Sequence, residues 1–220
     1  MTKNDIYLEM RRRICLLDYQ PGTRLNEREL ASEFGISRTP MRDVLQKLEH
    51  IGLISSQHGH GTIVTSIDLK SMRDIYVVRM RLMDAMGEST PTSIGPDILD
   101  EMSKLESRCD ALLQDHDKRE FALVLVRLHT ILHGLTSNAV LKEFNDILFY
   151  QSARFWFLLL DSVEMQVVVA DLKDEIRMLR RSQEIGDVKL MASIHKTYLG
   201  LVLSRLDAFD KQGVTQFDAN

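Results

Sequence analysis

Most of this chain, from about residue 68 to residue 210, has apolar residues at the three- and four-residue spacing of long amphipathic helices. A helix with one apolar face must bury that face against another element, so this spacing predicts an all-helical bundle. The pattern is interrupted at five places, which predicts about six helices: the breaks are 88–97, 115–118, 135–140, 160–165 and 184–188.

The first 65 residues follow a different pattern. Three short helical segments precede "GLISSQHGHGTIVT", in which two β-type runs surround a Gly-His-Gly turn and predict a hairpin. The chain is therefore expected to be mostly α, with two domains and a tail at 1–66, 67–212 and 213–220.

The composition is that of a globular cytoplasmic protein. Apolar residues make up 44% of the chain, and no apolar run reaches the roughly 20 residues of a membrane span. Cys15 and Cys109 fit a reducing compartment and are interpreted as core thiols. The net charge of −4 gives no general affinity for nucleic acid, so the position of the charges matters more than their total.

The segment "LNERELASEFGISRTPMRDVLQKLEHIGL" carries two consecutive helix starts. Asn26 is the expected N-cap of the first helix, with Glu29 completing a capping box. Gly35 can take a positive φ and end that helix. Ser37 is the expected cap of the next helix, and Pro40 is tolerated in its first turn. Two short helices joined through a glycine predict a helix-turn-helix.

Cations stand at the start of the second of these helices. Met41, Val44, Leu45, Leu48 and Ile51 have the helical spacing of a buried stripe, and the other face presents Arg38, Thr39, Arg42 and Gln46. Positive charge opposes the helix dipole there unless an anion binds. A duplex supplies that anion, and arginine can form a forked pair with guanine. An ordinary solvated face is the alternative.

The stretch "PGTRLNERELASEFGISRTPMRDVLQKLEHIGLI", followed by "GHGTIV", resembles the winged helix-turn-helix of the GntR family of bacterial regulators. The resemblance implies a double-stranded DNA operator as the partner. It also implies a set of operator-contacting residues: Arg28, Ser37, Arg38, Thr39, Arg42, His58 and Gly59. Of these, Arg28 is expected to contact phosphate, and Arg38 and Arg42 are expected to contact base edges.

The later segments "DLKSMRDIYVVRMRLMD", "LHTILHGLTSN" and "DEIRMLRRSQEIGDVKLMASIHKTYL" resemble the helical ligand-binding domain of the FadR/FCD subgroup. The resemblance implies a homodimer that binds a small-molecule effector in the bundle. Many members of the subgroup hold a divalent metal with one Asp and three His. The matching positions here are Leu125, His129, Ile176 and Tyr198, so one ligand of four remains and we expect no metal.

The same four positions are expected to line a pocket, and Arg79, Arg154 or Arg177 could bind a carboxylate there, with an organic acid as one candidate. Three alternatives stay open. Substitution could have filled the cavity, leaving the bundle to dimerise only. His129, His133 and His195 could form a rebuilt zinc or nickel site in a hydrolase. The N-terminal domain could bind DNA without sequence preference. The favoured hypothesis is a non-enzymatic homodimeric repressor that reads a palindromic operator.

Overall fold

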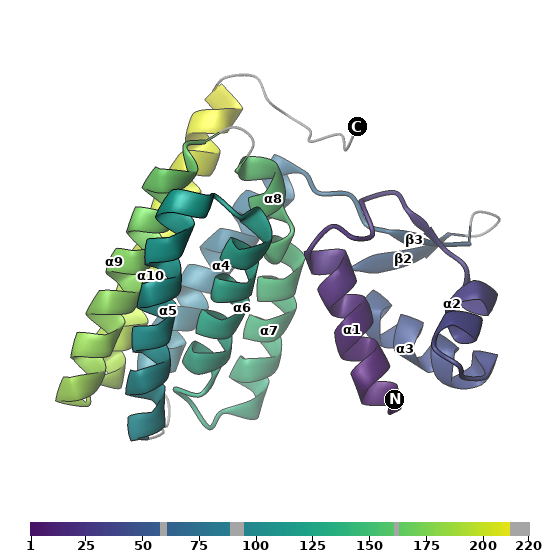
Figure 1. Cartoon of the computed structure of the whole chain (residues 1–220), viewed down its shortest axis with the longest axis horizontal. Coiled ribbons are helices and arrows are strands. Elements are labelled where there is room, and N and C mark those ends of the chain that lie inside the picture. Colours follow the sequence, from purple (N-terminus) through teal and green to yellow (C-terminus); the bar gives the residue numbers. More distant parts are fainter. Residues whose placement is uncertain (58–60, 89–94, 161–162, 212–220) are drawn as a thin grey trace. The chain divides into compact units, whose positions relative to one another are not determined.

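The structure is a computed structural model that describes residues 1–57, 61–88, 95–160 and 163–211 (Figure 1). His58 and Gly59, expected at the wing tip, and the expected tail at 213–220 lie outside these ranges. The chain divides into two compact units after Asp68.

The first unit contains three helices and a small sheet within its described residues. In chain order these elements are α1 (Lys3–Cys15), β1 (Arg24–Leu25), α2 (Glu27–Glu33), α3 (Arg38–His50), β2 (Ile54–Gln57) and β3 (Gly61–Val64). The sheet order is β1-β3-β2, and both strand pairs are antiparallel, with Ile54 opposite Val64 and Arg24 opposite Ile63. The two predicted β-type runs form β2 and β3, while β1 was not predicted.

The start of α2 differs in one detail from the expected capping box. The Asn26 side chain accepts hydrogen bonds from the backbone N–H groups of Arg28 and Glu29, at 2.9 and 3.4 Å. The Glu29 carboxylate, however, accepts from the Asn26 side chain at 3.0 Å, where a capping box would use the Asn26 backbone. Gly35 has φ +65°, as its predicted role in the turn requires.

The core of the first unit lies between α1 and α3. The stripe predicted on α3 buries Met41, Val44, Leu45 and Leu48, whereas Ile51 ends the helix and is only half-buried. The buried face of α1 opposes them with Ile6, Met10 and Ile14. This packing leaves the other face of α3, including Arg38 and Arg42, exposed.

The second unit is a helical bundle, as the sequence predicts (Figure 1). Its described residues form one helical element more than the expected six, because part of "ARFWFLLLD" forms a short separate helix after Arg154. The elements are α4 (Leu69–Glu88), α5 (Pro96–Asp115), α6 (Lys118–His133), α7 (Ala139–Ala153), α8 (Phe155–Leu159), α9 (Met165–Ile185) and α10 (Val188–Lys211).

The last helix occupies a central place in this bundle. It packs mainly against α4 and also against α9, and α9 in turn packs against α5. Trp156 of α8 lies in the core, with its ring 5.3 Å from that of Phe121 in an edge-to-face arrangement. Within the described residues, none of the helices has the length and apolar character needed to cross a membrane.

Candidate nucleic-acid interface and the buried polar centre

The amino end of α3 presents two arginines that share one carboxylate. Arg38 Nε donates to Glu27 Oε1 at 2.9 Å, and Arg42 donates from Nε to Glu27 Oε2 at 3.1 Å and from Nη2 to Oε1 at 3.3 Å. The hydrogen bond from Arg42 is the largest of the causes that lower the pKa of Glu27, and the same contact raises the pKa of Arg42. Glu27 therefore stays ionised and holds the two guanidinium groups together.

These ion pairs leave both arginines available to an anion. Their side chains are 65% exposed for Arg38 and 60% for Arg42. A guanidinium has five N–H donors, so the single bond of Arg38 and the two bonds of Arg42 use only part of this capacity. The remaining donors face solvent on a helix whose first backbone N–H groups also lack helical partners. Such a surface fits phosphate oxygens or the edge of a guanine.

The other predicted contact residues in the described ranges surround this helix start. Arg28, Ser37 and Thr39 are all exposed. The Ser37 side chain makes no capping hydrogen bond, contrary to expectation, so its hydroxyl is not used within the helix. Sequence reasoning missed Glu27, because its role depends on α2 and α3 meeting and not on any local spacing.

Four of the residues expected to form a pocket in the helical unit surround a very small void. Arg79, Leu125, His129 and Tyr198 line this void, whose volume is about 20 Å³. Arg154 and Ile176 are buried but do not line it. A space of this size holds about one water molecule. At these residues the structure therefore has a void of about the size of one water molecule, and not the ligand-sized pocket that the sequence predicts.

Arg79 is a buried cation beside this void. It is 4% exposed, and its Nη1 donates to the Ser152 hydroxyl at 3.1 Å. Its guanidinium carbon lies 5.3 Å from the centre of the Tyr76 ring and 5.4 Å from that of Phe149. Two aromatic rings thus stabilise the buried cation. Arg177, by contrast, is 45% exposed and pairs with Glu106 and Asp174, away from this centre.

Two carboxylates divide the three histidines of the hydrolase alternative into a neighbouring pair and a single residue. His129 Nε2 lies 2.6 Å from Asp146 Oδ1, and His133 Nε2 lies 3.5 Å from the other oxygen of the same carboxylate. His195 Nδ1 instead lies 2.5 Å from Glu175 Oε1. Asp146 and Glu175 carry no recognisable local signal, since they meet the histidines across helices.

The donor set does not fit the metal of the FCD subgroup. Leu125 and Ile176 have no donor atom, and the Nε2 of His129 is already engaged by Asp146. Within the described residues, no three His, Cys, Asp or Glu side chains are grouped so that they could hold a metal ion. These residues offer no set of ligands for the hydrolytic metal centre of the alternative hypothesis.

Comparison with known families agrees with the helix-turn-helix and the bundle. The model for "Bacterial regulatory proteins, gntR family" matches residues 2–64, and the model for the FCD domain matches residues 74–195, which is more than half of the chain. The chain belongs to the GntR family and carries an FCD domain. The matching model describes bacterial regulatory proteins, so the chain carries the two domains of such a regulator.

Two curated relatives indicate how far the similarity extends. The uncharacterized HTH-type transcriptional regulator YdhC of Bacillus subtilis (strain 168) is 28% identical over 138 residues, which cover 62% of this chain and 62% of that protein. The gluconate operon transcriptional repressor of Bacillus licheniformis is 26% identical over 197 residues, which cover 82% of this chain and 81% of that protein. The chain thus spans less than two thirds of YdhC but most of the repressor.

A solved structure supports the fold. The chain titled E. coli McbR/YncC superposes with a TM-score of 0.73 at 16% identity, over 94% of this chain and 99% of that chain. At this identity the likeness shows the fold alone.

Proposed function

We propose that this GntR-family chain is a sequence-specific, DNA-binding transcriptional repressor that acts as a cytoplasmic homodimer. The observation that carries the proposal is the pair of exposed arginines, Arg38 and Arg42, that Glu27 holds at the amino end of α3. The names of the relatives, which include a gluconate operon repressor, agree with this role.

In this proposal the amino end of α3 enters the major groove. Arg38 and Arg42 contact base edges there, because a guanidinium can pair with the two acceptors of guanine. Arg28, Ser37 and Thr39 contact phosphate and set the register of the helix on the duplex. The wing residues His58 and Gly59 contribute a further contact to the backbone or the minor groove.

A homodimer presents two copies of α3, so its operator is a palindrome with half-sites about one helical turn apart. A small-molecule effector bound to the FCD domain would change operator affinity. By linkage, DNA must then change effector affinity by the same factor. The void beside Arg79, at about 20 Å³, is too small for such an effector in this structure.

Genomic SELEX with the purified chain tests the proposal. We expect enrichment of one palindromic sequence, and tighter binding to it than to a scrambled duplex in competition at a fixed salt concentration. Uniform enrichment, with steep salt dependence and no sequence preference, would instead identify a nonspecific DNA binder and reject the proposal.

A first mutational prediction concerns Glu27. Glu27→Gln removes a negative charge beside the phosphates and weakens the contact that holds Arg38 and Arg42 together. We expect affinity for a scrambled duplex to rise by about threefold to tenfold at low salt, because the ion pairs no longer compete with phosphate. Affinity for the operator should rise less, so the ratio of the two affinities falls. Fluorescence anisotropy titrations on both duplexes measure this ratio.

Glu33→Gln provides the matched control. It removes the same charge from the same helix, but Glu33 pairs with Arg13 of α1, at 2.5 Å, and not with the arginines of α3. We expect this variant to keep the wild-type ratio. Equal loss of discrimination in both variants would mean that total charge, and not the position of Glu27, controls specificity.

A further inference from the structure

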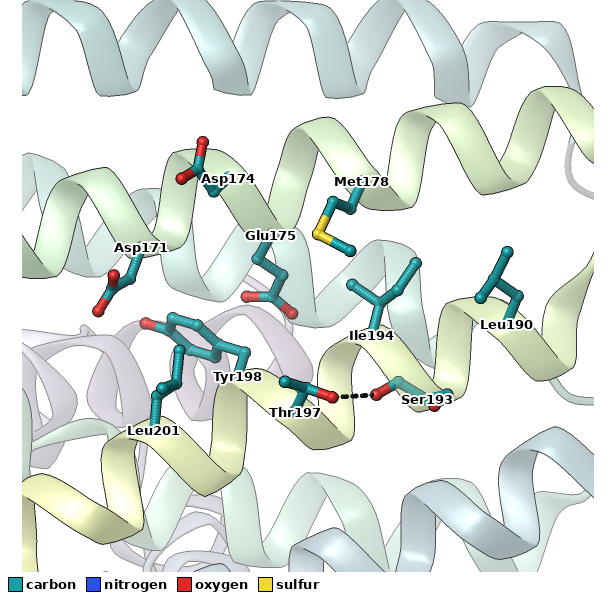
Figure 2. Close-up of a pocket in the computed structure, with 10 residues that line it drawn as sticks. All are labelled: Asp171, Asp174, Glu175, Met178, Leu190, Ser193, Ile194, Thr197, Tyr198 and Leu201. Carbon is teal, nitrogen blue, oxygen red and sulfur yellow. Dashed lines mark hydrogen bonds between the residues drawn. The ribbon is translucent and has the colours of Figure 1, made fainter.

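A second and larger cavity, which we call the α9/α10 groove, lies between α9 and α10 of the helical unit. It shares Tyr198 with the void beside Arg79. Its volume is about 330 Å³, and Figure 2 shows side chains from both helices around it. This volume lies at the lower end of the range for small-molecule pockets, about 300–1,000 Å³. The groove is thus large enough for a small effector, unlike the void beside Arg79.

Two buried polar atoms in this groove have no hydrogen-bond partner. Glu175 is 4% exposed and Tyr198 is 5% exposed, and both line the groove. Glu175 uses Oε1 to contact His195, but its Oε2 has no partner, and neither does the hydroxyl of Tyr198. Figure 2 shows both side chains between the two helices. Leaving such groups unpaired is costly, so a ligand that pairs with them gains affinity.

The charge around these two atoms selects the ligand. The described residues that line the groove include three acidic residues, Asp171, Asp174 and Glu175, and no basic one. Asp171 pairs with Arg205 and Asp174 with Arg177, so each of the two has a countercharge. Glu175 is the buried carboxylate with a vacant oxygen, and it favours a cation that can donate a hydrogen bond.

The walls of the groove are apolar. Met178, Leu190 and Leu201 line it and are 54%, 41% and 45% exposed, and the buried Ile194 lines it as well. Solvent-exposed apolar side chains around a polar centre are typical of a site for an amphipathic molecule. The ligand should therefore combine a cationic head with a short apolar tail.

We propose that the α9/α10 groove binds a small amphipathic organic cation, such as a primary ammonium, whose N–H groups donate to Glu175 Oε2 and Tyr198 Oη. The apolar tail lies against Met178, Leu190 and Leu201. This inference rests on the proposed effector-dependent regulator, since it names the chemical class of the effector and its site.

The groove is coupled to the buried centre of the domain. Tyr198 lines both the groove and the void beside Arg79. Its ring stacks on that of His195, which lines only the void, with centroids 6.3 Å apart. Glu175, the proposed ligand of the ammonium group, is held by His195. A cation that binds Glu175 therefore acts on His195, which lines the same void as Arg79.

Isothermal titration calorimetry of the full chain tests the site with three probes of equal tail length. We expect hexylamine to bind with one equivalent per chain and hexanoate to give no detectable binding. The affinity for 1-hexanol should be lower than that for hexylamine by about tenfold or more. Equal affinity for all three probes, or binding of none of them, would overturn the inference.

Two charge-introducing variants separate the groove from the general surface. Leu201→Lys places a cation on the groove wall, and we expect it to weaken hexylamine binding by about tenfold or more. Val167→Lys is the matched control, because Val167 is 49% exposed on α9 and does not line the groove; it should bind like wild type. Equal binding in both variants would contradict the proposed location.

Glu175→Gln tests the polar centre. We expect it to lower the affinity for hexylamine by about tenfold or more, with an unchanged circular dichroism spectrum.

Analytical ultracentrifugation tests a second copy of the chain as the occupant. Dissociation of the dimer by Leu201→Lys but not by Val167→Lys would assign the groove to the dimer interface and reject the ligand. Operator binding is measured separately. If the chain binds its operator but does not bind hexylamine, this inference is wrong and the proposed function stands.

Discussion

Arg38→Ala is expected to weaken binding to the cognate operator by about 1–3 kcal/mol, which raises the Kd by roughly 5- to 150-fold. The reason is that alanine cannot form the forked pair with guanine that we assign to this side chain. Arg38 is 65% exposed and contacts Glu27 only through Nε, so the substitution should leave the fold intact. Fluorescence anisotropy on the operator, at fixed salt, measures the loss.

The effect of Arg38→Ala should depend on sequence. At the base pair that Arg38 reads, the variant should tolerate substitutions that wild type rejects. Arg28→Ala is the comparison variant, because a lost phosphate contact weakens binding to every sequence alike and reduces the salt dependence. If both variants bind the operator as wild type does, the assignment of these contacts is wrong.

The second large effect concerns pH. Burial lowers the pKa of His129 from 6.5 to about 4, although the hydrogen bond to Asp146 opposes this change. As pH falls below 6.5, the unfolded chain takes up a proton at this residue and the folded chain does not. The stability that the neutral imidazole contributes is therefore present above pH 6.5 and is lost as pH falls toward 4. With about 1.4 kcal/mol for each pKa unit, the loss is about 3 kcal/mol.

His129→Phe should flatten this dependence. Phenylalanine keeps an aromatic ring against Phe149, which stacks on His129 with ring centres 3.8 Å apart, and it does not titrate. Urea unfolding at a series of pH values from 7 to 4 provides the measurement. The pKa of Glu9 is lowered to about 2, mainly by Arg12, so its contribution is lost mostly below pH 4.5. Burial raises the pKa of Glu175, which acts in the opposite direction above pH 4.5, so the contribution of His129 is read as the difference in slope between wild type and His129→Phe. An unchanged slope in the variant would contradict the role of His129.

Local rules account for what the sequence predicted correctly in the first unit. The cap at Asn26, the positive φ at Gly35 and the buried stripe from Met41 to Leu48 each depend on residues within one or two helical turns. The exposure of Arg38 and Arg42 follows directly, because they lie opposite that stripe. The separate helix α8 was missed because its boundary at Arg154 carries no glycine or proline signal.

The polar contacts of both units could not be predicted in this way. Glu27 meets Arg38 and Arg42 across two helices, and Glu175 meets His195 across α9 and α10. Such pairs depend on helix rotation and spacing, which are set by the packing of all neighbouring side chains. The volumes of the two cavities could not be predicted from the sequence either. A cavity is the space that remains after large side chains have packed, and its size depends on how all of them pack together.

The sequence by itself determined the helix-turn-helix, the helical bundle and the basic face of α3, because each follows from the spacing of residues within a few helical turns. It also determined the membership of a regulator family, because a long contiguous motif indicates it. Only the tertiary structure decided that Glu27 joins the two arginines, that the expected pocket beside Arg79 holds about 20 Å³, and that the larger groove lies between α9 and α10. The physical reason is that contacts and volumes between helices depend on side chains far apart in the sequence, whose positions are fixed only when the whole core packs.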